Sequence, residues 1–353
     1  MTRDTTENKR QAWNRQGNMR VPAARRFSVL ANGVRRIHAA GVEPLTFKPL
    51  YMERVWGGRE LERVYGRTLP DPKAFYGESW EIVDREREQS VVDHGPLAGT
   101  SLHELWSTRR EEIFGTGYGE HARFPILIKV LDARADLSIQ VHPPARVAAE
   151  LGGEPKTEMW FIADCEPGAK LHVGLKRGVT KTDFEHAIAH GTVAACVHAI
   201  APRPGDSIFI TAGRLHAIGT GFLIHEIQQN SDTTYRVFDW NRPGLDGKPR
   251  DLHVAQSLAS IDFNDIEPAM DRPACDILGA CAHFQTARKS FAMGEAVAPA
   301  DAGKFAILSV VQGVLESAGG RRFGKGCFVL LPRGTVPLRA LADTTVLLVT
   351  LPE

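Results

Sequence analysis

The sequence lacks any run of about 18 apolar residues, the length that a helix needs to cross a lipid bilayer. It also lacks a surplus of charge, because 43 lysines and arginines almost cancel 42 aspartates and glutamates. The first absence argues against a membrane-spanning helix. The second argues against a broad basic surface for nucleic acid and favours small or locally charged ligands as partners.

Cysteine is scarce and follows no pattern. The five cysteines, at positions 165, 196, 275, 281 and 327, are scattered and form no C-x-x-C pair. An odd, unpatterned set predicts reduced thiols in a cytoplasmic protein. Buried, inert thiols are a simpler interpretation than reactive ones.

The first 40 residues differ in composition from the rest. They hold nine lysines and arginines against two acids, Asp4 and Glu7, and no long apolar segment. This composition does not fit a secretory signal. We expect a basic, disordered arm without a function of its own; the alternatives are a transit peptide or a translation start near Met19.

What the sequence has in abundance, from Leu45 onward, is short apolar or alternating runs separated by glycine, proline and aspartate. Examples are "FPILIKVLDA", "LSIQVH", "EMWFIADC" and "TGFLIHEIQQ". This spacing predicts a mainly β protein, with the strands in a sandwich or barrel. Helices are expected at 101–114, at 182–191, with Thr182 and Glu185 as a capping box and Gly191 as the stop, and at 252–261.

The stretch "LSIQVHPP" combines strand pattern with unusual chemistry. In a strand, Ser138, Gln140 and His142 share one face, opposite Ile139 and Val141. A face lined with a hydroxyl, an amide and an imidazole is costly to bury unless partners satisfy it. A bound ion and a polar ligand would provide such partners.

Two further residues extend this set. Glu158 begins an apolar strand, and His216 follows Gly213 in "GRLHAIG". Two imidazoles, a carboxylate and the Gln140 amide suit Zn²⁺, Fe²⁺ or Mn²⁺, with a position left open for catalysis. The alternative is a set of ordinary buried or surface histidines, and spacing alone does not decide between the two. A similar glycine-bounded segment at 326–334 is followed by "TVPL" and so has no histidine.

These motifs together resemble the type I mannose-6-phosphate isomerase (phosphomannose isomerase) family in its short bacterial form, within the cupin superfamily. The resemblance rests on "WGG", "GESWEI", "FPILIKVLDA", "LSIQVHP", "KTEMW", "GRLHAIG" and "EIQQNSDTTYRVFDWNR". Gln140 replaces the first histidine of the usual cupin His-x-His pair, and Thr211 stands where proline is usual. The resemblance implies one divalent metal, usually zinc, on Gln140, His142, Glu158 and His216.

The family likeness also implies an architecture. We expect a cupin (jelly-roll) barrel with helical insertions and a second, smaller, degenerate cupin-like β domain. The boundaries predicted are a catalytic metal-binding domain at 41–240 with a helical insert around 101–123, a connector with a helix at 241–275, and a β domain without metal ligands at 276–353.

The resemblance implies isomerisation of mannose 6-phosphate and fructose 6-phosphate through a cis-enediol. It places Lys156 and Arg236 in the site for phosphate and developing charge, and both are expected to act in catalysis, with Lys156 also binding the substrate. Taken alone, Arg236 would be interpreted as a surface salt bridge with Asp232 or Asp239, and Lys156 as a solvated loop charge. The remaining expected substrate-binding residues are Ser138, Glu226, Asp232 and Trp56.

Some roles and alternatives stay open at this point. Glu226 is either a buried acceptor or the proton-transfer base, and Glu78 is expected to accept hydrogen bonds behind the site. A non-catalytic sugar-binding cupin and a metal-dependent dioxygenase are the alternative functions. We expect a cytoplasmic monomer or weak homodimer that acts on a small sugar phosphate.

Overall fold

The computed structural model describes residues 43–119, 121–273 and 275–352. The predicted basic arm at 1–40 lies outside these ranges. Residues 41–353 cluster as one compact unit, and the predicted domain boundaries at 240 and 275 stay predictions. Within the described ranges, no helix combines the length and apolar character needed to span a membrane.

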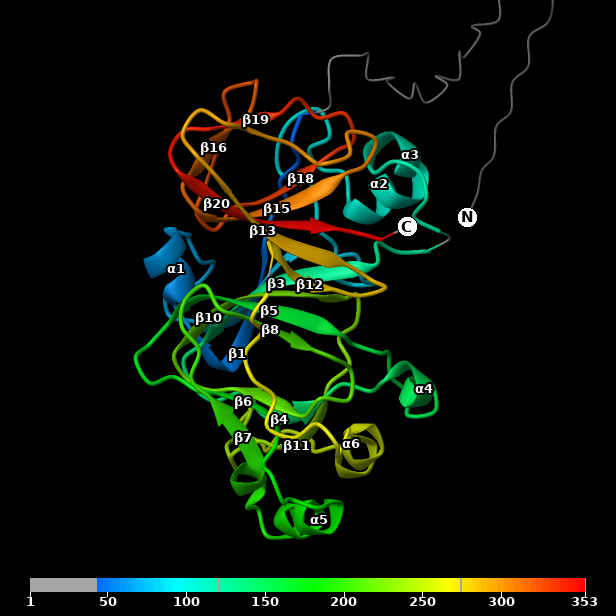
Figure 1. The fold of residues 1–353 in the computed structure, drawn as a ribbon, viewed down its shortest axis with the longest axis vertical. Coiled ribbons are helices and arrows are strands. Elements are labelled where there is room, and N and C mark those ends of the chain that lie inside the picture. Colours follow the sequence, from blue (N-terminus) through cyan, green and yellow to red (C-terminus); the bar gives the residue numbers. More distant parts are fainter. Residues whose placement is uncertain (1–42, 120, 274, 353) are drawn as a thin grey trace, which may run out of the picture. The chain divides into compact units, whose positions relative to one another are not determined.

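Two antiparallel sheets form the first part of the fold (Figure 1). The strand order in the first is β1 (Leu50–Gly58), β2 (Tyr76–Ile82), β3 (Ile126–Ala133), β10 (Phe222–Gln229), β5 (Glu158–Cys165) and β8 (Ser207–Ile210). The order in the second is β11 (Tyr235–Phe238), β4 (Ile139–Val141), β9 (His216–Ile218), β6 (Leu171–Leu175) and β7 (Val197–Ile200).

Two more antiparallel sheets follow along the chain. The third has the order β12 (Ile277–Ala280), β13 (Gln285–Phe291), β20 (Thr344–Thr350), β15 (Ala306–Gln312) and β18 (Phe328–Leu331). The fourth has the order β14 (Ala296–Val297), β19 (Leu338–Ala340), β16 (Val314–Glu316) and β17 (Arg322–Gly324). The prediction of a mainly β protein is therefore confirmed.

The second pair of sheets repeats the strand order of the first. The orders β3-β10-β5-β8 and β4-β9-β6-β7 recur, with ten added to every number, as β13-β20-β15-β18 and β14-β19-β16-β17. The matched segments at 205–213 and 326–334 supply β8 and β18, which occupy the same edge position. Closure of either pair of sheets into a jelly-roll barrel stays a prediction.

The interiors of the two pairs differ in chemistry. Apolar side chains fill the space between the third and fourth sheets, namely Val297, Leu308, Val310, Leu315, Phe323, Val329, Leu331, Leu338, Ala340 and Val346. Apolar side chains also lie between the first and second sheets, but these two sheets enclose in addition the polar site described below. Among the described residues, the first pair of sheets is therefore the one whose interior suits a polar ligand.

One large hydrophobic core joins the first and third sheets. Ile128 and Phe161 contribute from the first sheet, and Phe328, Leu347 and Val349 from the third. Because side chains alternate along a strand, Lys129 points to the opposite face from Ile128. All eight residues of β3 are buried, which explains its nearly continuous apolar sequence.

The helices agree with the sequence in place but not in every boundary. The predicted helix at 101–114 is two helices, α2 (Leu102–Thr108) and α3 (Arg110–Ile113), because the chain leaves helical geometry at Arg109. The break brings Trp106 and Phe114 together, with ring centroids 5.0 Å apart. The predicted helix at 252–261 is α6 (Val254–Ser260).

The expected capping box of the helix at 182–191 is wrong by two residues. In α5 (Lys181–Ala189) the box joins Thr180 and Asp183, whose side chains bond each other's backbone N–H groups. Thr182 therefore lies within the first turn. The remaining helical segments are α1 (Glu60–Tyr65), α4 (Ala145–Ala148) and the 3₁₀ segment η1 (Val193–Cys196).

Candidate active site and metal centre

The polar site lies between the first and second sheets, and strand register aligns its residues. In the second sheet Arg236 pairs with Gln140, and Gln140 pairs with His216. Directly paired residues present their side chains on the same face, so these three form a row across β11, β4 and β9. In the first sheet Glu226 pairs with Lys129 on one side and Trp160 on the other.

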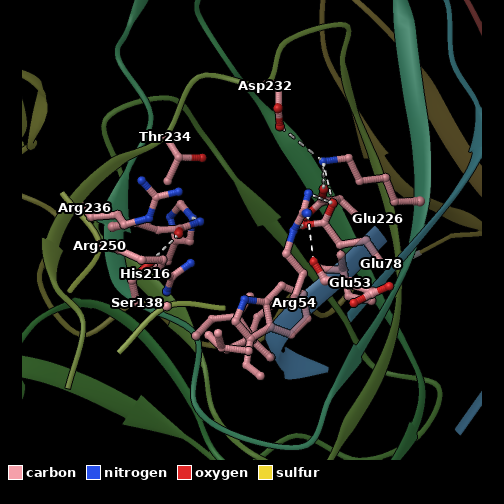
Figure 2. Close-up of a pocket in the computed structure, with 18 of the residues that line it drawn as sticks. Glu53, Arg54, Glu78, Ser138, His216, Glu226, Asp232, Thr234, Arg236 and Arg250 are labelled. Carbon is pink, nitrogen blue, oxygen red and sulfur yellow. Dashed lines mark hydrogen bonds and ion pairs between the residues drawn. The ribbon is translucent and has the colours of Figure 1, made fainter. Parts of the chain in front are cut away.

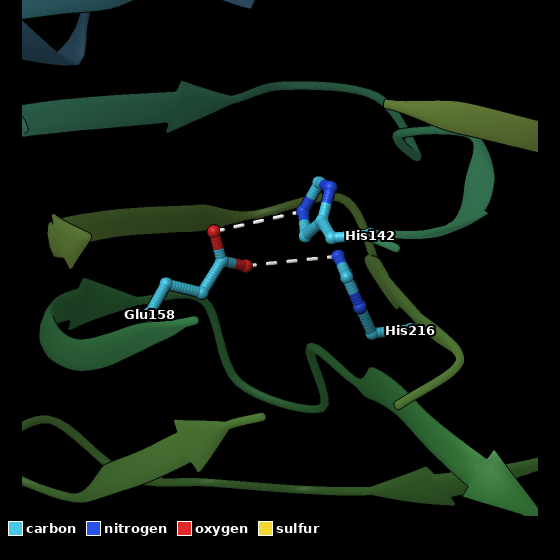
Figure 3. Close-up of side chains that lie close together, drawn as sticks. All are labelled: His142, Glu158 and His216. Atoms are coloured by element: carbon cyan, nitrogen blue, oxygen red, sulfur yellow. Dashed lines mark ion pairs between the residues drawn. The ribbon is translucent and has the colours of Figure 1, made fainter. Parts of the chain in front are cut away.

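Three side chains from both sheets converge on one point (Figure 3). His142 Nε2 lies 3.6 Å from one oxygen of Glu158, and His216 Nε2 lies 3.6 Å from the other. All three residues are buried, and their ligand atoms lie within 4.8 Å of one another. Imidazole and carboxylate groups so arranged are able to bind a divalent metal ion.

The local backbone holds both imidazoles in the orientation a metal needs. His142 Nδ1 lies 2.8 Å from the Thr233 carbonyl oxygen, and His216 Nδ1 lies 2.9 Å from the Arg214 carbonyl oxygen. An Nδ1–H donated to a carbonyl leaves Nε2 free as a ligand. Gly213, at φ +96°, makes the turn before β9 and donates its N–H to the His142 carbonyl, which ties the two ligand segments together.

Burial keeps the two imidazoles neutral, and neighbouring groups keep the carboxyl ionised. Burial and the nearby Lys156 charge lower the pKa of His142, while burial and His142 lower the pKa of His216 to about 3. Burial opposes ionisation of Glu158, but the charge of Lys156 and the contact with His142 outweigh it and hold the pKa of this carboxyl well below its usual range. Neutral imidazoles and a carboxylate are the protonation states that ligate metals.

The group passes a simple test of fit for a metal ion. Both carboxylate oxygens of Glu158 are buried without a hydrogen bond. The Lys156 ammonium lies 2.7 Å from one of them as an ion pair, outside hydrogen-bond geometry. Buried acceptors normally have partners, and a cation beside both imidazoles would satisfy these two.

Gln140 lies beside the group in a position to extend it. Its amide nitrogen is 3.3 Å from His216 Nε2, and its oxygen accepts a hydrogen bond of 3.0 Å from Ser138. Ligation through the oxygen requires the amide to rotate, a change that exchanges only the positions of O and N. Ile139 and Val141 are buried on the opposite face of this strand, as expected.

A cavity of about 420 Å³ opens beside this group (Figure 2). Among the residues predicted for the site, those that line the cavity are Trp56, Ser138, Gln140, Lys156, His216, Glu226, Asp232 and Arg236. His142 and Glu158 lie buried behind it, in contact with Lys156. The structure thus brings all the predicted site residues into one region.

The two walls of the cavity differ in charge. On one side in Figure 2 lie Ser138, Thr234, Arg236 and Arg250; on the other lie Glu53, Arg54, Glu78 and Glu226. Asp232, whose side chain is 53% exposed, lies 3.8 Å from the Lys129 ammonium. Among the described residues, neither Asp232 nor Asp239 forms an ion pair with Arg236, so the interpretation of Arg236 as a surface salt bridge is wrong, although the charges of both carboxylates act to raise its pKa against the larger, lowering effect of burial.

Glu226 is buried between two ammonium groups. One oxygen accepts a hydrogen bond of 3.0 Å from Trp160 Nε1, while the other lies 3.7 Å from Lys156 Nζ and 3.8 Å from Lys129 Nζ. Burial and the nearby Glu158 charge raise the pKa of Glu226 to about 7, against the opposing effect of the two lysines. A carboxyl with a pKa near 7 is suited to accept and return protons.

Sequence reasoning missed several cavity residues, of which Lys129 is the clearest. Its side chain is 3% exposed and lies 3.8 Å from carboxylate oxygens of Glu78, Glu226 and Asp232. The signal was available, because a lysine stands inside the apolar run "FPILIKVLDA". Glu78 accepts hydrogen bonds from Trp80 and Arg54, in agreement with the accepting role expected of it. Arg54 and Arg250 had no comparable signal.

Similar proteins point to one family. The family model of the phosphomannose isomerase type I catalytic domain matches residues 45–159. The mannose-6-phosphate isomerase ManA of Bacillus subtilis (strain 168) is 36% identical over 304 residues, which cover 83% of this chain and 94% of that protein. The mannose-6-phosphate isomerase of Streptococcus mutans is 36% identical over 233 residues, covering 66% of this chain and 71% of that protein.

Solved structures agree with these sequence matches. The mannose 6-phosphate isomerase of Bacillus subtilis matches with a TM-score of 0.78 and 30% identity, over 88% of this chain and 100% of that one. A variant of phosphomannose isomerase from Salmonella typhimurium, at 15% identity and a TM-score of 0.65, shares the fold. The match to Bacillus subtilis ManA is 36% identical and spans 94% of that protein. The chain therefore belongs to the type I phosphomannose isomerase family.

Proposed function

We propose that the chain interconverts mannose 6-phosphate and fructose 6-phosphate as a metal-dependent aldose–ketose isomerase. The observation that carries the proposal is the buried group of His142, Glu158 and His216 beside a cavity with a cationic wall. The two Glu158 oxygens without hydrogen bonds support a metal ion there. The family to which the chain belongs supports the sugar phosphate as substrate.

Gln140, His142, Glu158 and His216 would hold one divalent cation, which we propose to be zinc. When bound, the cation supplies Lewis-acid polarisation of the carbonyl end of the sugar. The Nδ1 hydrogen bonds of the two histidines to backbone carbonyls support their part of this set, since such bonds orient metal-bound imidazoles.

The chain's own residues would carry the proton and stabilise charge. Glu226 would take a proton from one of the two carbons, C1 or C2, and return it to the other, through a cis-enediol; its raised pKa supports this role. Lys156 and Lys129 lie within 4 Å of Glu226 and favour its ionised form. Arg236 would stabilise the negative charge that develops on the substrate oxygens during the transfer.

Several neighbours would position the sugar. Ser138 offers its hydroxyl to sugar hydroxyls and phosphate, Asp232 offers its carboxylate to sugar hydroxyls, and Trp56 offers an apolar wall. Ser138 and Trp56 are buried in the cavity lining, which supports fixed positions for both. The proposed fold is a catalytic cupin barrel followed by a smaller cupin-like domain, and the repeated strand order supports it. The proposed setting is the cytoplasm, as a monomer or weak homodimer.

The direct test is an isomerase assay on the zinc-loaded chain. Mannose 6-phosphate should yield fructose 6-phosphate, a chelator should abolish the conversion, and added zinc should restore it. Oxygen uptake without isomerised sugar would favour the dioxygenase alternative. Binding of the sugar phosphate with no conversion, by fully metal-loaded protein, would leave only the sugar-binding alternative.

Arg236→Ala is expected to separate chemistry from metal binding. The Nε of this guanidinium is buried without a partner, and its row neighbour is Gln140. Loss of one preorganised charge donor should lower kcat about 100-fold, with metal content unchanged. Metal analysis and steady-state kinetics check both points.

Arg236→Lys serves as the comparison, because it keeps the charge but loses the planar fork, and it should lie between the wild type and the alanine variant. If Arg236→Ala loses as much metal as a ligand variant does, the division between metal-binding and charge-stabilising residues is incorrect.

A further inference from the structure

The cationic wall of the cavity contains a second guanidinium to which sequence analysis gave no role. Arg250 lines the cavity beside Arg236, and both point into it on the same side in Figure 2. Its charge is close enough to contribute to a lowered pKa of Arg236, after burial as the larger cause. Two guanidiniums held near each other repel, so an anion bound between them would be favourable in addition to the nearby carboxylates.

We propose that Arg250, held in place by Asp239, binds the phosphate group of the substrate and selects phosphorylated sugars. The inference rests on the proposed function and assigns one end of the substrate to a specific wall of the cavity. Arg250 is then a substrate-binding residue, and Asp239 is a positioning residue that acts through it.

The contact with Asp239 presents the guanidinium in a fixed orientation. Arg250 donates from Nε to one oxygen of Asp239 and from Nη2 to the other, both at 2.6 Å. This paired arrangement uses one edge of the guanidinium, and Nη1 has no hydrogen-bond partner among the described residues. A planar guanidinium fixed along one edge leaves the other donors for a phosphate oxygen, without the cost of ordering a free side chain.

The cations on the opposite wall lie near carboxylates that themselves line the cavity, whereas Asp239, the partner of Arg250, does not line it. Arg54 pairs with Glu78, Lys129 lies near Glu78, Glu226 and Asp232, and Lys156 pairs with Glu158 and Glu226. A phosphate placed on that side would meet Glu53, Glu78 and Glu226 and be repelled. The wall formed by Arg236 and Arg250 is therefore the favourable place for an anion.

The charges around Arg250 suit a phosphate monoester. Three guanidiniums, those of Arg236, Arg242 and Arg250, lie near a single buried carboxylate, Asp239, which pairs with the last two. Asp239 and Asp232, whose charges both act on Arg236, offset only part of the charge of the three guanidiniums, and a phosphate group would offset the rest. Asp246 also lines the cavity, and its Oδ1 accepts a hydrogen bond from the backbone N–H of Lys248.

The chain offers a matched control for this role. Arg242 also pairs with Asp239, at 2.9 Å, but it does not line the cavity. Arg242→Gln removes the same kind of ion pair as Arg250→Gln and leaves the cavity guanidiniums in place. Comparing the two variants shows whether Arg250 contacts the phosphate or only stabilises the loop between β11 and α6.

The experiment uses the zinc-loaded full chain and two phosphate probes. Arg250→Gln should raise KM for mannose 6-phosphate and the inhibition constant of inorganic phosphate about tenfold or more, with kcat changed less than about threefold. Arg242→Gln should shift all three constants less than about threefold. Arg250→Lys, which keeps the charge, should give an intermediate KM and serves in place of the glutamine variant if that variant does not fold.

The inference is overturned if Arg250→Gln keeps wild-type constants, if Arg242→Gln raises KM as much, or if kcat alone falls. Calorimetric titration of inorganic phosphate into wild-type and variant proteins needs no catalysis. If the wild type does not isomerise the sugar, the proposed function fails, while weaker phosphate binding by Arg250→Gln would still support this site.

Discussion

His216→Ala should lose the metal and the isomerase activity together. His216 is 1% exposed, its Nε2 faces Glu158, and its Nδ1 is fixed by the Arg214 carbonyl, so no other described group replaces it. A cation left with fewer ligands binds more weakly, and the polarisation it supplies is worth several kcal/mol. We expect kcat/KM to fall roughly 10³-fold or more, checked by metal analysis and kinetics on the same preparation.

A second histidine in the same part of the sheet provides the control. His172 on β6 pairs with Ala217, which is next to His216 on β9, so its side chain lies on the opposite face. His172→Ala should therefore keep metal content and kcat/KM within about threefold of the wild type. Full metal content in His216→Ala, or equal losses in the two variants, would contradict the proposed ligand set.

Glu226→Gln should abolish most of the turnover while leaving the metal in place. Removal of a positioned general base costs about 10²- to 10⁴-fold in rate. Glutamine keeps the shape and can still accept the hydrogen bond from Trp160, so the loss reports the missing proton acceptor rather than a cavity. Glu166→Gln is the matched control. Glu166 lies outside the cavity and pairs with Arg134, so this variant should behave as the wild type.

The pH dependence gives an independent check on Glu226. Its pKa is raised to about 7, chiefly by burial. A carboxyl must be ionised to act as a base, so kcat should be highest above this pKa and should fall as the pH drops through it. A bound divalent cation favours the ionised form and moves the acidic limb to lower pH. An identical acidic limb in Glu226→Gln would assign that limb, and the base, to another group.

Much of the fold follows from local pattern. Alternating and continuous apolar runs predicted the strands because pleated strands repeat every two residues and buried ones need apolar side chains on both faces. Local pattern did not predict the start of α5, because Thr180 and Thr182 are equally able to cap a helix. It did not predict the break at Arg109 either, because that break accompanies the packing of Trp106 against Phe114. The repeated strand order is a long-range property that no short segment contains.

The site divides in the same way. Ser138, Gln140 and His142 were visible because a polar face on a strand demands an explanation, and the family likeness added Lys156 and Arg236. Lys129 could have been predicted, because a lysine inside an apolar strand is unusual. Arg250 could not, because its segment has the composition of a connector. Its importance depends on Asp239 and Arg236 being near it in space, and only the folded chain brings these groups to one wall.

The hydrophobic core between the first and third sheets limits how this molecule can be divided. Ile128 and Phe161 lie on the reverse side of the strands that present Lys129 and Trp160 to the cavity, and they pack against Phe328 and Leu347. A shortened chain that stopped before β13 would leave those aromatic and branched side chains in water and invite self-association. The second pair of sheets therefore covers an apolar surface of the first pair, and this role requires apolar side chains on its facing strands but no metal-binding groups in its own interior.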